Sequence, residues 1–145
     1  MNQKYFLLDI NSVIIPINKP SLIFLRGGVW LWKTTLSKHI INDLLWDKST
    51  VISPTYTYYN SYTGIVHFDL YRIKDYDEFF AIGWEDILDN NTWVVIVEWP
   101  EKIEKYYTPD IDITLKETEN EGERELEIVY KTICPLLIPG LGTSS

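Results

Sequence analysis

The sequence predicts an α/β fold organised around a mainly parallel sheet. Two apolar runs, Leu22–Leu25 and Trp93–Glu98, have the pattern of strands that are buried on both faces of a parallel sheet. Directly after the first run, residues 33–45 repeat apolar side chains at the spacing of one helix face, at Leu36, Ile40, Ile41, Leu44 and Leu45. Strands that alternate with helices along a chain are typical of this fold class.

The remaining strands are predicted from shorter patterns. Apolar segments bounded by turn residues are expected to form strands at Tyr5–Leu8, Val13–Ile15 and Thr50–Ser53. Gly64–Tyr71 alternates apolar and polar residues, which puts His67 and Asp69 on one face of a strand. Tyr56–Tyr62 is rich in tyrosine and threonine and fits either a strand or an ordered loop.

The C-terminal half combines short helices with a hairpin. Short helices are expected at Asp75–Phe80, Glu85–Asp89 and Glu101–Tyr106. Asp110–Leu115 and Glu123–Tyr130 alternate apolar and polar residues on either side of a turn, which predicts an antiparallel pair of strands. We expect one domain over residues 1–131, followed by a loosely ordered tail over 132–145, which contains two prolines and two glycines.

Composition excludes several classes of protein. The 145 residues carry a net charge of −8, which argues against a free-standing nucleic-acid binder, because such a protein shows a basic face. The single cysteine, Cys134, allows no internal disulfide and is expected to be a small buried apolar residue. No apolar run approaches the length that spans a bilayer, and no secretory leader pattern is present at the N-terminus, so a cytoplasmic location is expected.

A glycine-containing loop joins the first buried run to the helix that follows it. Residues 27–34 read GGVWLWKT and match the phosphate-binding loop pattern G-x-x-x-x-G-K-[ST], except that Trp32 stands at the second glycine. In such a loop, backbone N–H groups and the helix N-terminus bind phosphate oxygens. Lys33 suits the terminal phosphates and the Thr34 hydroxyl suits Mg²⁺. The alternative on this loop alone is a surface helix that begins with Lys-Thr-Thr by chance.

Polar residues at the ends of other predicted strands could complete a nucleotide site. Ligands bind at the carboxyl ends of the strands in open α/β sheets, and phosphoryl transfer needs a Mg²⁺ site and a residue that orients the attacking water. Thr55, Asp69 and Glu98 each stand at or near such an end. Taken singly, Glu98 reads as a solvated acid and Asp69 as an ion-pair partner of a nearby basic residue, and His67 as a half-buried structural histidine.

Taken together, these residues resemble a known family. The segments SPTY at 53–56, HFDLYR at 67–72 and EWP at 98–100, in this order after a phosphate-binding loop, are similar to the TsaE (YjeE) ATPases over about residues 22–124. The resemblance implies a small P-loop ATPase that uses ATP and Mg²⁺. It also implies a role in forming threonylcarbamoyladenosine beside the anticodon of tRNA, with a TsaD–TsaB-like complex as the partner and tRNA met only through that complex.

The resemblance also implies roles for individual residues. Lys33, Thr55 and Asp69 would serve catalysis, and Thr34 and Glu98 would bind the Mg²⁺ ion. The nucleotide would lie against the loop and the start of the helix, which comprise Gly27, Gly28, Val29, Trp30, Leu31, Trp32, Lys33, Thr34 and Thr35. Trp99 would flank the nucleotide.

Tryptophan replaces glycine at three positions of the family pattern: Trp30, Trp32 and Trp46. The first two lie in the loop, where glycine allows positive φ and a close approach to the ligand, and where indole bulk would obstruct phosphate. Some bacteria read the codon UGA as glycine, whereas several translation tables read it as tryptophan. We therefore hypothesise that these three residues are glycines in the natural protein.

Two other functions remain open on the sequence. One is a degenerate P-loop scaffold that binds protein partners without nucleotide, since Trp30 and Trp32 replace loop glycines. The presence of Thr55, Asp69 and Glu98 argues against it, because a scaffold has no use for a Mg²⁺ site. The other is a small phosphotransferase that uses the same loop, which is less favoured because no segment resembles an acceptor-binding lid.

Overall fold

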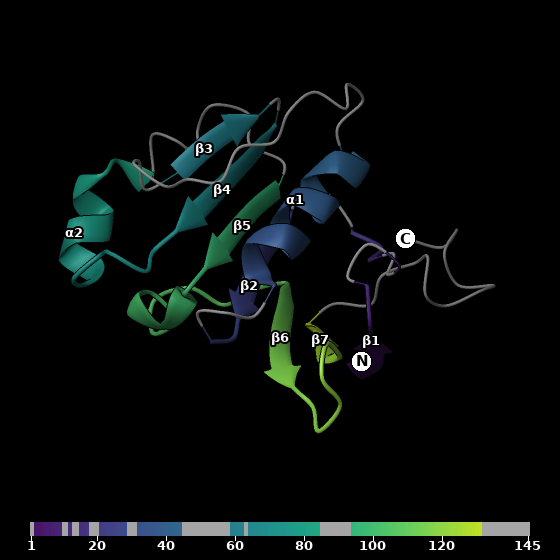
Figure 1. The fold of residues 1–145 in the computed structure, drawn as a ribbon. Helices are drawn as coiled ribbons and strands as arrows, with labels where there is room; N and C mark the ends of the chain where they lie inside the picture. Colours follow the sequence, from purple (N-terminus) through teal and green to yellow (C-terminus); the bar gives the residue numbers. More distant parts are fainter. Residues whose placement is uncertain are drawn as a thin grey trace.

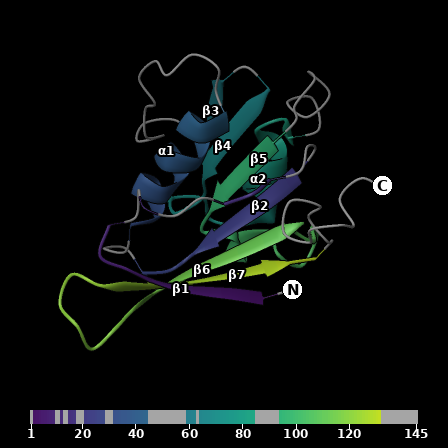
Figure 2. The same ribbon diagram turned by 90° about the vertical axis from the view of Figure 1, so that its right-hand side faces the viewer.

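The structure is a computed structural model that describes residues 2–9, 12, 15–17, 21–28, 32–44, 59–62, 64–84 and 94–131. In this part of the chain, one sheet of seven strands has the order β1-β7-β6-β2-β5-β4-β3 (Figures 1 and 2). In chain order the elements are β1 (Asn2–Leu7), β2 (Ser21–Arg26), α1 (Lys33–Leu44), β3 (Tyr59–Tyr62), β4 (Ile65–Asp69), α2 (Tyr76–Ala81), β5 (Val94–Glu98), the 3₁₀ helix η2 (Pro100–Lys102), β6 (Ile111–Glu117) and β7 (Arg124–Tyr130).

The middle of the sheet is parallel, as predicted. β4 pairs with β5, β5 with β2, and β2 with β6, all in parallel. The register sets Glu98, the last residue of β5, opposite Leu25 on one side and Asp69 on the other. The carboxyl ends of β2, β4 and β5 therefore meet at one edge of the sheet, where ligands bind in this class of fold.

Antiparallel strands extend the sheet on both sides. β6 and β7 form the predicted C-terminal hairpin, and β1 pairs antiparallel with β7 at one edge. At the other edge β3 pairs antiparallel with β4, so the tyrosine-rich segment contributes a strand. The strand expected at Thr50–Ser53, the helix expected at Glu85–Asp89 and the tail at 132–145 lie outside the described residues.

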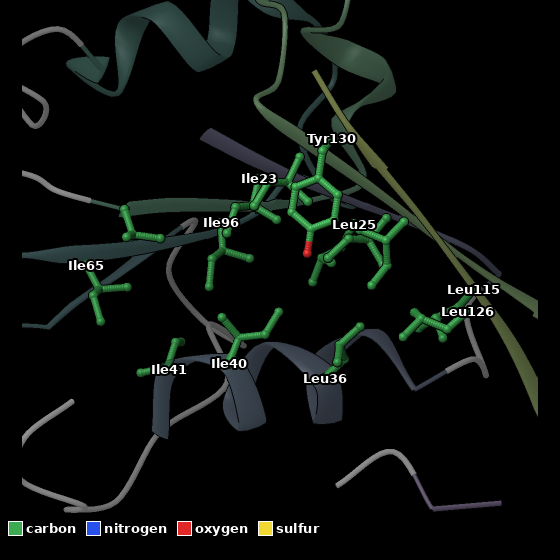
Figure 3. Packing of buried hydrophobic residues seen from close by; sticks show 14 of the residues in the cluster. Ile23, Leu25, Leu36, Ile40, Ile41, Ile65, Ile96, Leu115, Leu126 and Tyr130 are labelled. Atoms are coloured by element: carbon green, nitrogen blue, oxygen red, sulfur yellow. The ribbon is translucent and has the colours of Figure 1, made fainter. Parts of the chain in front are cut away.

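The α1 helix covers one face of the sheet, and its predicted apolar face makes the contact (Figure 3). Leu36, Ile40 and Ile41 lie on the buried side of α1 and pack into one core cluster with Ile23 and Ile96 of the central strands. Burial of these side chains is the main force that holds the helix, because it removes their apolar surface from water. The beginning of α1 is thereby fixed beside the carboxyl ends of β2 and β5.

The opposite face of the sheet packs against α2 and an aromatic cluster. Phe68 of β4 and Phe79 of α2 lie 5.3 Å apart between ring centroids, and Trp84 packs against both rings. The Asp75 side chain caps α2 by accepting a hydrogen bond from the Glu78 N–H at 3.0 Å. None of the helices in the described ranges has the length and apolar character needed to cross a bilayer.

Candidate functional site

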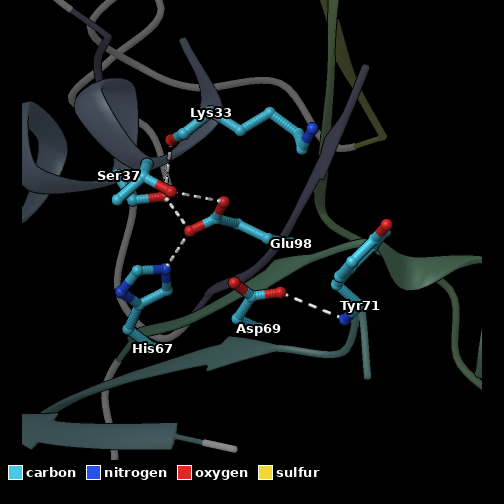
Figure 4. Close-up of polar contacts among 7 residues, drawn as sticks. Lys33, Ser37, His67, Asp69, Tyr71 and Glu98 are labelled. Carbon is cyan, nitrogen blue, oxygen red and sulfur yellow. Dashed lines mark hydrogen bonds and ion pairs between the residues drawn. The ribbon is translucent and has the colours of Figure 1, made fainter. Parts of the chain in front are cut away.

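Four residues predicted from the sequence meet at the carboxyl edge of the parallel strands (Figure 4). Lys33 and Thr34 begin α1, which follows β2 after the loop. Asp69 is the last residue of β4 and Glu98 is the last residue of β5. The chain thus brings a cation, a hydroxyl and two carboxylates together from three separate elements.

Glu98 is the centre of this site. The residue is buried, with a relative exposure of 1%, so the single-residue interpretation of Glu98 as a solvated acid is wrong. One carboxylate oxygen lies 3.1 Å from the Thr34 hydroxyl, and the other lies 3.2 Å from the Ser37 hydroxyl and 2.5 Å from Nε2 of His67. Buried carboxylates are costly unless donors surround them, and these three groups supply the donors.

Two members of this network, Ser37 and His67, were not predicted as site residues. Ser37 lies one helical turn after Lys33, and its hydroxyl is 2.9 Å from the Lys33 carbonyl oxygen as well as near Glu98. The spacing of three residues between Thr34 and Ser37 could have predicted this contact, because it places both hydroxyls on one side of α1. His67 is fully buried rather than half-buried, because its face of β4 is covered.

The ammonium group of Lys33 is hydrogen-bonded to the backbone of the loop that precedes α1. Its Nζ donates hydrogen bonds to the carbonyl oxygens of Gly27 and Gly28, at 2.9 and 2.6 Å. The same atom lies 4.1 Å from the centroid of the Trp99 ring, within the range of a cation–π interaction. Gly27 has a φ of 149°, a conformation that suits glycine, so the start of the loop meets its backbone requirement.

Burial shifts the titration of both charged groups that flank Glu98. Burial lowers the pKa of Lys33, and the nearby carboxylates of Glu98, Asp69 and Glu101 oppose this shift. Burial raises the pKa of Asp69, and the Glu98 carboxylate adds to the rise. The Tyr71 backbone N–H, which donates to Asp69 Oδ1 at 3.1 Å, works in the opposite direction. The fold therefore disfavours the charged form of each group, as is common at functional sites.

The family model described as "Threonylcarbamoyl adenosine biosynthesis protein TsaE" matches residues 7–126 of this chain. The chain belongs to the TsaE family. This family acts in the biosynthesis of threonylcarbamoyladenosine in tRNA.

Curated relatives agree with this assignment, and a solved structure shares the fold. The chain is 32% identical over 131 residues to the tRNA threonylcarbamoyladenosine biosynthesis protein TsaE of Rickettsia felis, covering 87% of this chain and 75% of the relative. It is 30% identical over 118 residues to TsaE of Haemophilus influenzae, covering 79% and 73%. A crystal structure of Bacillus subtilis YdiB has the same fold, with a TM-score of 0.62 and 22% identity over 91% of this chain and 87% of that one.

Trp99 has a backbone conformation that is unusual for a residue other than glycine. Its φ of 59° and ψ of 57° lie in the left-handed region, and it is the one non-glycine residue with positive φ in the described ranges. The Trp99 ring contacts the ring of Tyr71, with 4.9 Å between the two centroids, and the same Trp99 ring lies over the Lys33 ammonium group. Strained backbone of this kind is retained where the surroundings hold it in place, often at ligand sites.

Trp32 packs against the protein. Its ring is partly buried against the core cluster beneath α1, and the Arg124 guanidinium of β7 lies 5.0 Å from the ring centroid. The fold therefore accommodates the Trp32 side chain between the core cluster and Arg124. The other loop residues Val29, Trp30 and Leu31, as well as Trp46 and Thr55, lie outside the described residues.

The donor set of the site suits Mg²⁺. The Thr34 hydroxyl and the Glu98 carboxylate are hard oxygen donors 3.1 Å apart at the start of a helix, and Mg²⁺ prefers such oxygens. Within the described ranges, no group of three or more His, Cys, Asp or Glu side chains could hold a metal ion by itself. This pattern fits an ion shared with phosphate oxygens, which is the usual way that Mg²⁺ binds in nucleotide sites.

Proposed function

We propose that this chain hydrolyses ATP to ADP and phosphate, and that this reaction supports threonylcarbamoyladenosine modification of tRNA by a TsaD–TsaB-like complex. The observation that carries the proposal is the contact between Thr34, at the start of α1, and the buried Glu98, at the end of β5. These are the two positions from which a P-loop enzyme holds its Mg²⁺ ion. Membership of the family supports the role in tRNA modification.

Lys33 would bind the terminal phosphates. In the structure its ammonium group is held by two loop carbonyls, so binding would exchange these acceptors for charged phosphate oxygens. Charge-assisted hydrogen bonds of this kind are stronger than those to neutral carbonyls. Thr34 and Glu98 would hold Mg²⁺, which neutralises charge on the phosphates during transfer.

Asp69 would orient the attacking water. Its carboxylate stands beside Glu98 at the sheet edge, and the Tyr71 N–H holds one of its oxygens in place. Burial raises the pKa of Asp69, which makes its carboxylate a better proton acceptor than an exposed aspartate. By the family resemblance, Thr55 would belong to a loop that changes with the nucleotide state, and Trp99 would flank the nucleotide.

The partner of the ATPase would be a protein complex. The net charge of −8 disfavours direct contact with tRNA and suits a basic protein surface. The tyrosine-rich segment 56–59 is a candidate contact, since tyrosine is enriched at protein interfaces. We expect the reaction to take place in the cytoplasm. Tight binding of tRNA by the isolated chain would contradict this arrangement.

Nucleotide binding with and without Mg²⁺ tests the ATPase proposal. Calorimetry with ADP should be performed on the chain as written and on a Trp30→Gly/Trp32→Gly chain, because indole bulk in the loop can weaken binding. We expect ADP affinity to rise with Mg²⁺ in at least the second chain, and we expect ATP turnover there. If neither chain binds nucleotide, the degenerate scaffold that binds protein partners becomes the favoured function.

A further inference from the structure

We propose that His67 is a positioning residue that fixes the carboxylate of Glu98 for Mg²⁺. The inference rests on the proposed ATPase function and adds a residue to which that function assigned no role. The His67 ring is fully buried, and its Nε2 lies 2.5 Å from Glu98 Oε2, the shortest contact that this carboxylate makes in the described network (Figure 4). Residues behind metal ligands commonly set ligand orientation and metal affinity.

The direction of this hydrogen bond follows from the chemistry of the pair. A carboxylate that binds a metal ion is ionised and only accepts hydrogen bonds. Nε2 of His67 therefore carries the proton and is the donor of the hydrogen bond to Glu98. The ring stands on β4, on the face where α1 and the end of β5 meet. Register places Asp69, two residues further along the same strand face, opposite Glu98. One strand would thus supply both the group that fixes the metal ligand and the group that orients water.

His67 is the rigid donor among the three donors to Glu98. The hydroxyls of Thr34 and Ser37 can rotate their protons to other acceptors, and the Ser37 hydroxyl already lies 2.9 Å from the Lys33 carbonyl. The Thr34 oxygen would in addition turn to the metal when nucleotide binds. A planar ring that is fully buried cannot redirect its N–H in this way. The orientation of Glu98 should therefore depend on His67 most when the metal site is in use.

The other ring nitrogen argues that packing alone does not explain this histidine. Among the described residues, Nδ1 of His67 is buried and has no hydrogen-bond partner. A buried polar atom without a partner costs stability, so an apolar side chain of similar size would serve a purely structural position better. The hydrogen bond that Nε2 donates to Glu98 explains why a histidine stands here despite the cost of its Nδ1, which is unpaired within the described part of the chain.

Three substitutions of His67 separate positioning from packing. His67→Gln can place an amide N–H where Nε2 lies, His67→Asn places one nearer to Nδ1, and His67→Leu removes the donor but keeps most of the volume. The measurement is the gain in ADP affinity caused by MgCl₂, obtained by calorimetry. It uses the chain that binds ADP, either as written or with glycine at positions 30 and 32. Val66→Ala is the matched control, because Val66 is buried on the other face of β4.

We expect His67→Leu and His67→Asn to reduce the Mg²⁺-dependent gain by about 10-fold or more, the range seen for residues behind metal ligands. ADP affinity without Mg²⁺ should stay unchanged, and His67→Gln should recover most of the gain. Val66→Ala should lower the melting temperature and leave the gain intact. If His67→Leu does not fold, the comparison of Gln with Asn gives the answer.

Two results would overturn the inference, and they have different consequences. Equal Mg²⁺-dependent gains in the parent, Gln and Asn chains would show that His67 is a packing residue only, while the ATPase proposal stands. Absence of any Mg²⁺-dependent gain in the parent, with either loop, would remove the proposed function and the role of His67 together.

Discussion

The ammonium group of Lys33 lies 4.1 Å from the centroid of the Trp99 ring and donates hydrogen bonds to the carbonyls of Gly27 and Gly28. The lysine that should bind phosphate is thus engaged by its own loop and covered by an aromatic ring. Under the proposed function, a bound nucleotide would replace these contacts of Lys33 with contacts to phosphate oxygens. The environment of Trp99 should therefore report on occupancy of the site.

The first prediction is that Mg²⁺–ADP changes the fluorescence of Trp99. A cation close to the indole affects its emission. Under the proposed function, the Lys33 ammonium group, now 4.1 Å from the Trp99 ring centroid, would move toward phosphate when nucleotide binds. The chain contains six tryptophans, so the signal is assigned by difference with a Trp99→Phe chain. Titration with Mg²⁺–ADP should change the emission of the parent, and Trp99→Phe should lose most of that change. An equal change in both chains would place the effect at another tryptophan.

The second prediction concerns Lys33 and Glu98, to which the proposed function assigns the terminal phosphates and the Mg²⁺ ion. In a chain with a working loop, Lys33→Ala and Glu98→Ala should each reduce ATP turnover by about 100-fold or more, because each removes charge stabilisation of phosphoryl transfer. Steady-state hydrolysis provides the measurement, and circular dichroism shows that the fold is retained. Lys102→Ala, an exposed lysine of η2, is the matched control and should keep parental turnover. Turnover that survives either site substitution would remove that residue from the mechanism.

The third prediction is a pH-dependent gain of stability in Asp69→Asn. Burial raises the pKa of Asp69 in the fold, so its contribution to stability is fully present below the pKa of an unfolded aspartate, about 3.9. That contribution is lost as pH rises through the raised folded value. At pH 7 the carboxylate therefore costs stability, and asparagine, which still accepts from the Tyr71 N–H, should melt higher than the parent.

Thermal unfolding between pH 4 and 7 measures this effect. The advantage of Asp69→Asn should be largest at pH 7 and shrink toward pH 4, while ATP turnover is lost at every pH. Glu121→Gln, in the exposed turn between β6 and β7, should show no comparable trend. A lower melting temperature for Asp69→Asn at pH 7 would mean that the charge of Asp69 stabilises the fold.

The sequence predicted the sheet well where burial alone determines the pattern. The runs that became β2 and β5 are apolar because both of their faces are covered, and the alternation of β6 and β7 reflects one covered face. The pairing of β1 with β7 could not be predicted, because it joins the two ends of the described chain. Strand partners far apart in sequence leave no local signal.

The sequence predicted that Thr34 and Glu98 belong to one site, but it did not predict that Ser37 and His67 contact Glu98. Lys33 and Thr34 belong to a local motif, and Glu98 ends a strand, so each has a sequence signal. The contact of His67 with Glu98 depends on the register of β4 against β5 and on how α1 closes over both. That information is three-dimensional, which is why the full burial of Glu98 and His67 could not be predicted.

The last prediction is that Trp30, Trp32 and Trp46 are encoded by UGA codons that the natural host reads as glycine. Loss of constraint would replace glycines with many residue types, whereas these three positions all carry tryptophan. The gene gives the direct measurement, since UGG codons would end the hypothesis, and peptide masses from the natural protein would show glycine if it holds. In the recombinant chain, restoring glycine at 30 and 32 should strengthen ADP binding, because glycine permits the positive φ and the close approach to phosphate that such a loop needs. Trp84→Gly is the contrasting substitution: Trp84 is buried in the aromatic cluster with Phe68 and Phe79, so its loss should destabilise the fold by about 3–5 kcal/mol without improving binding.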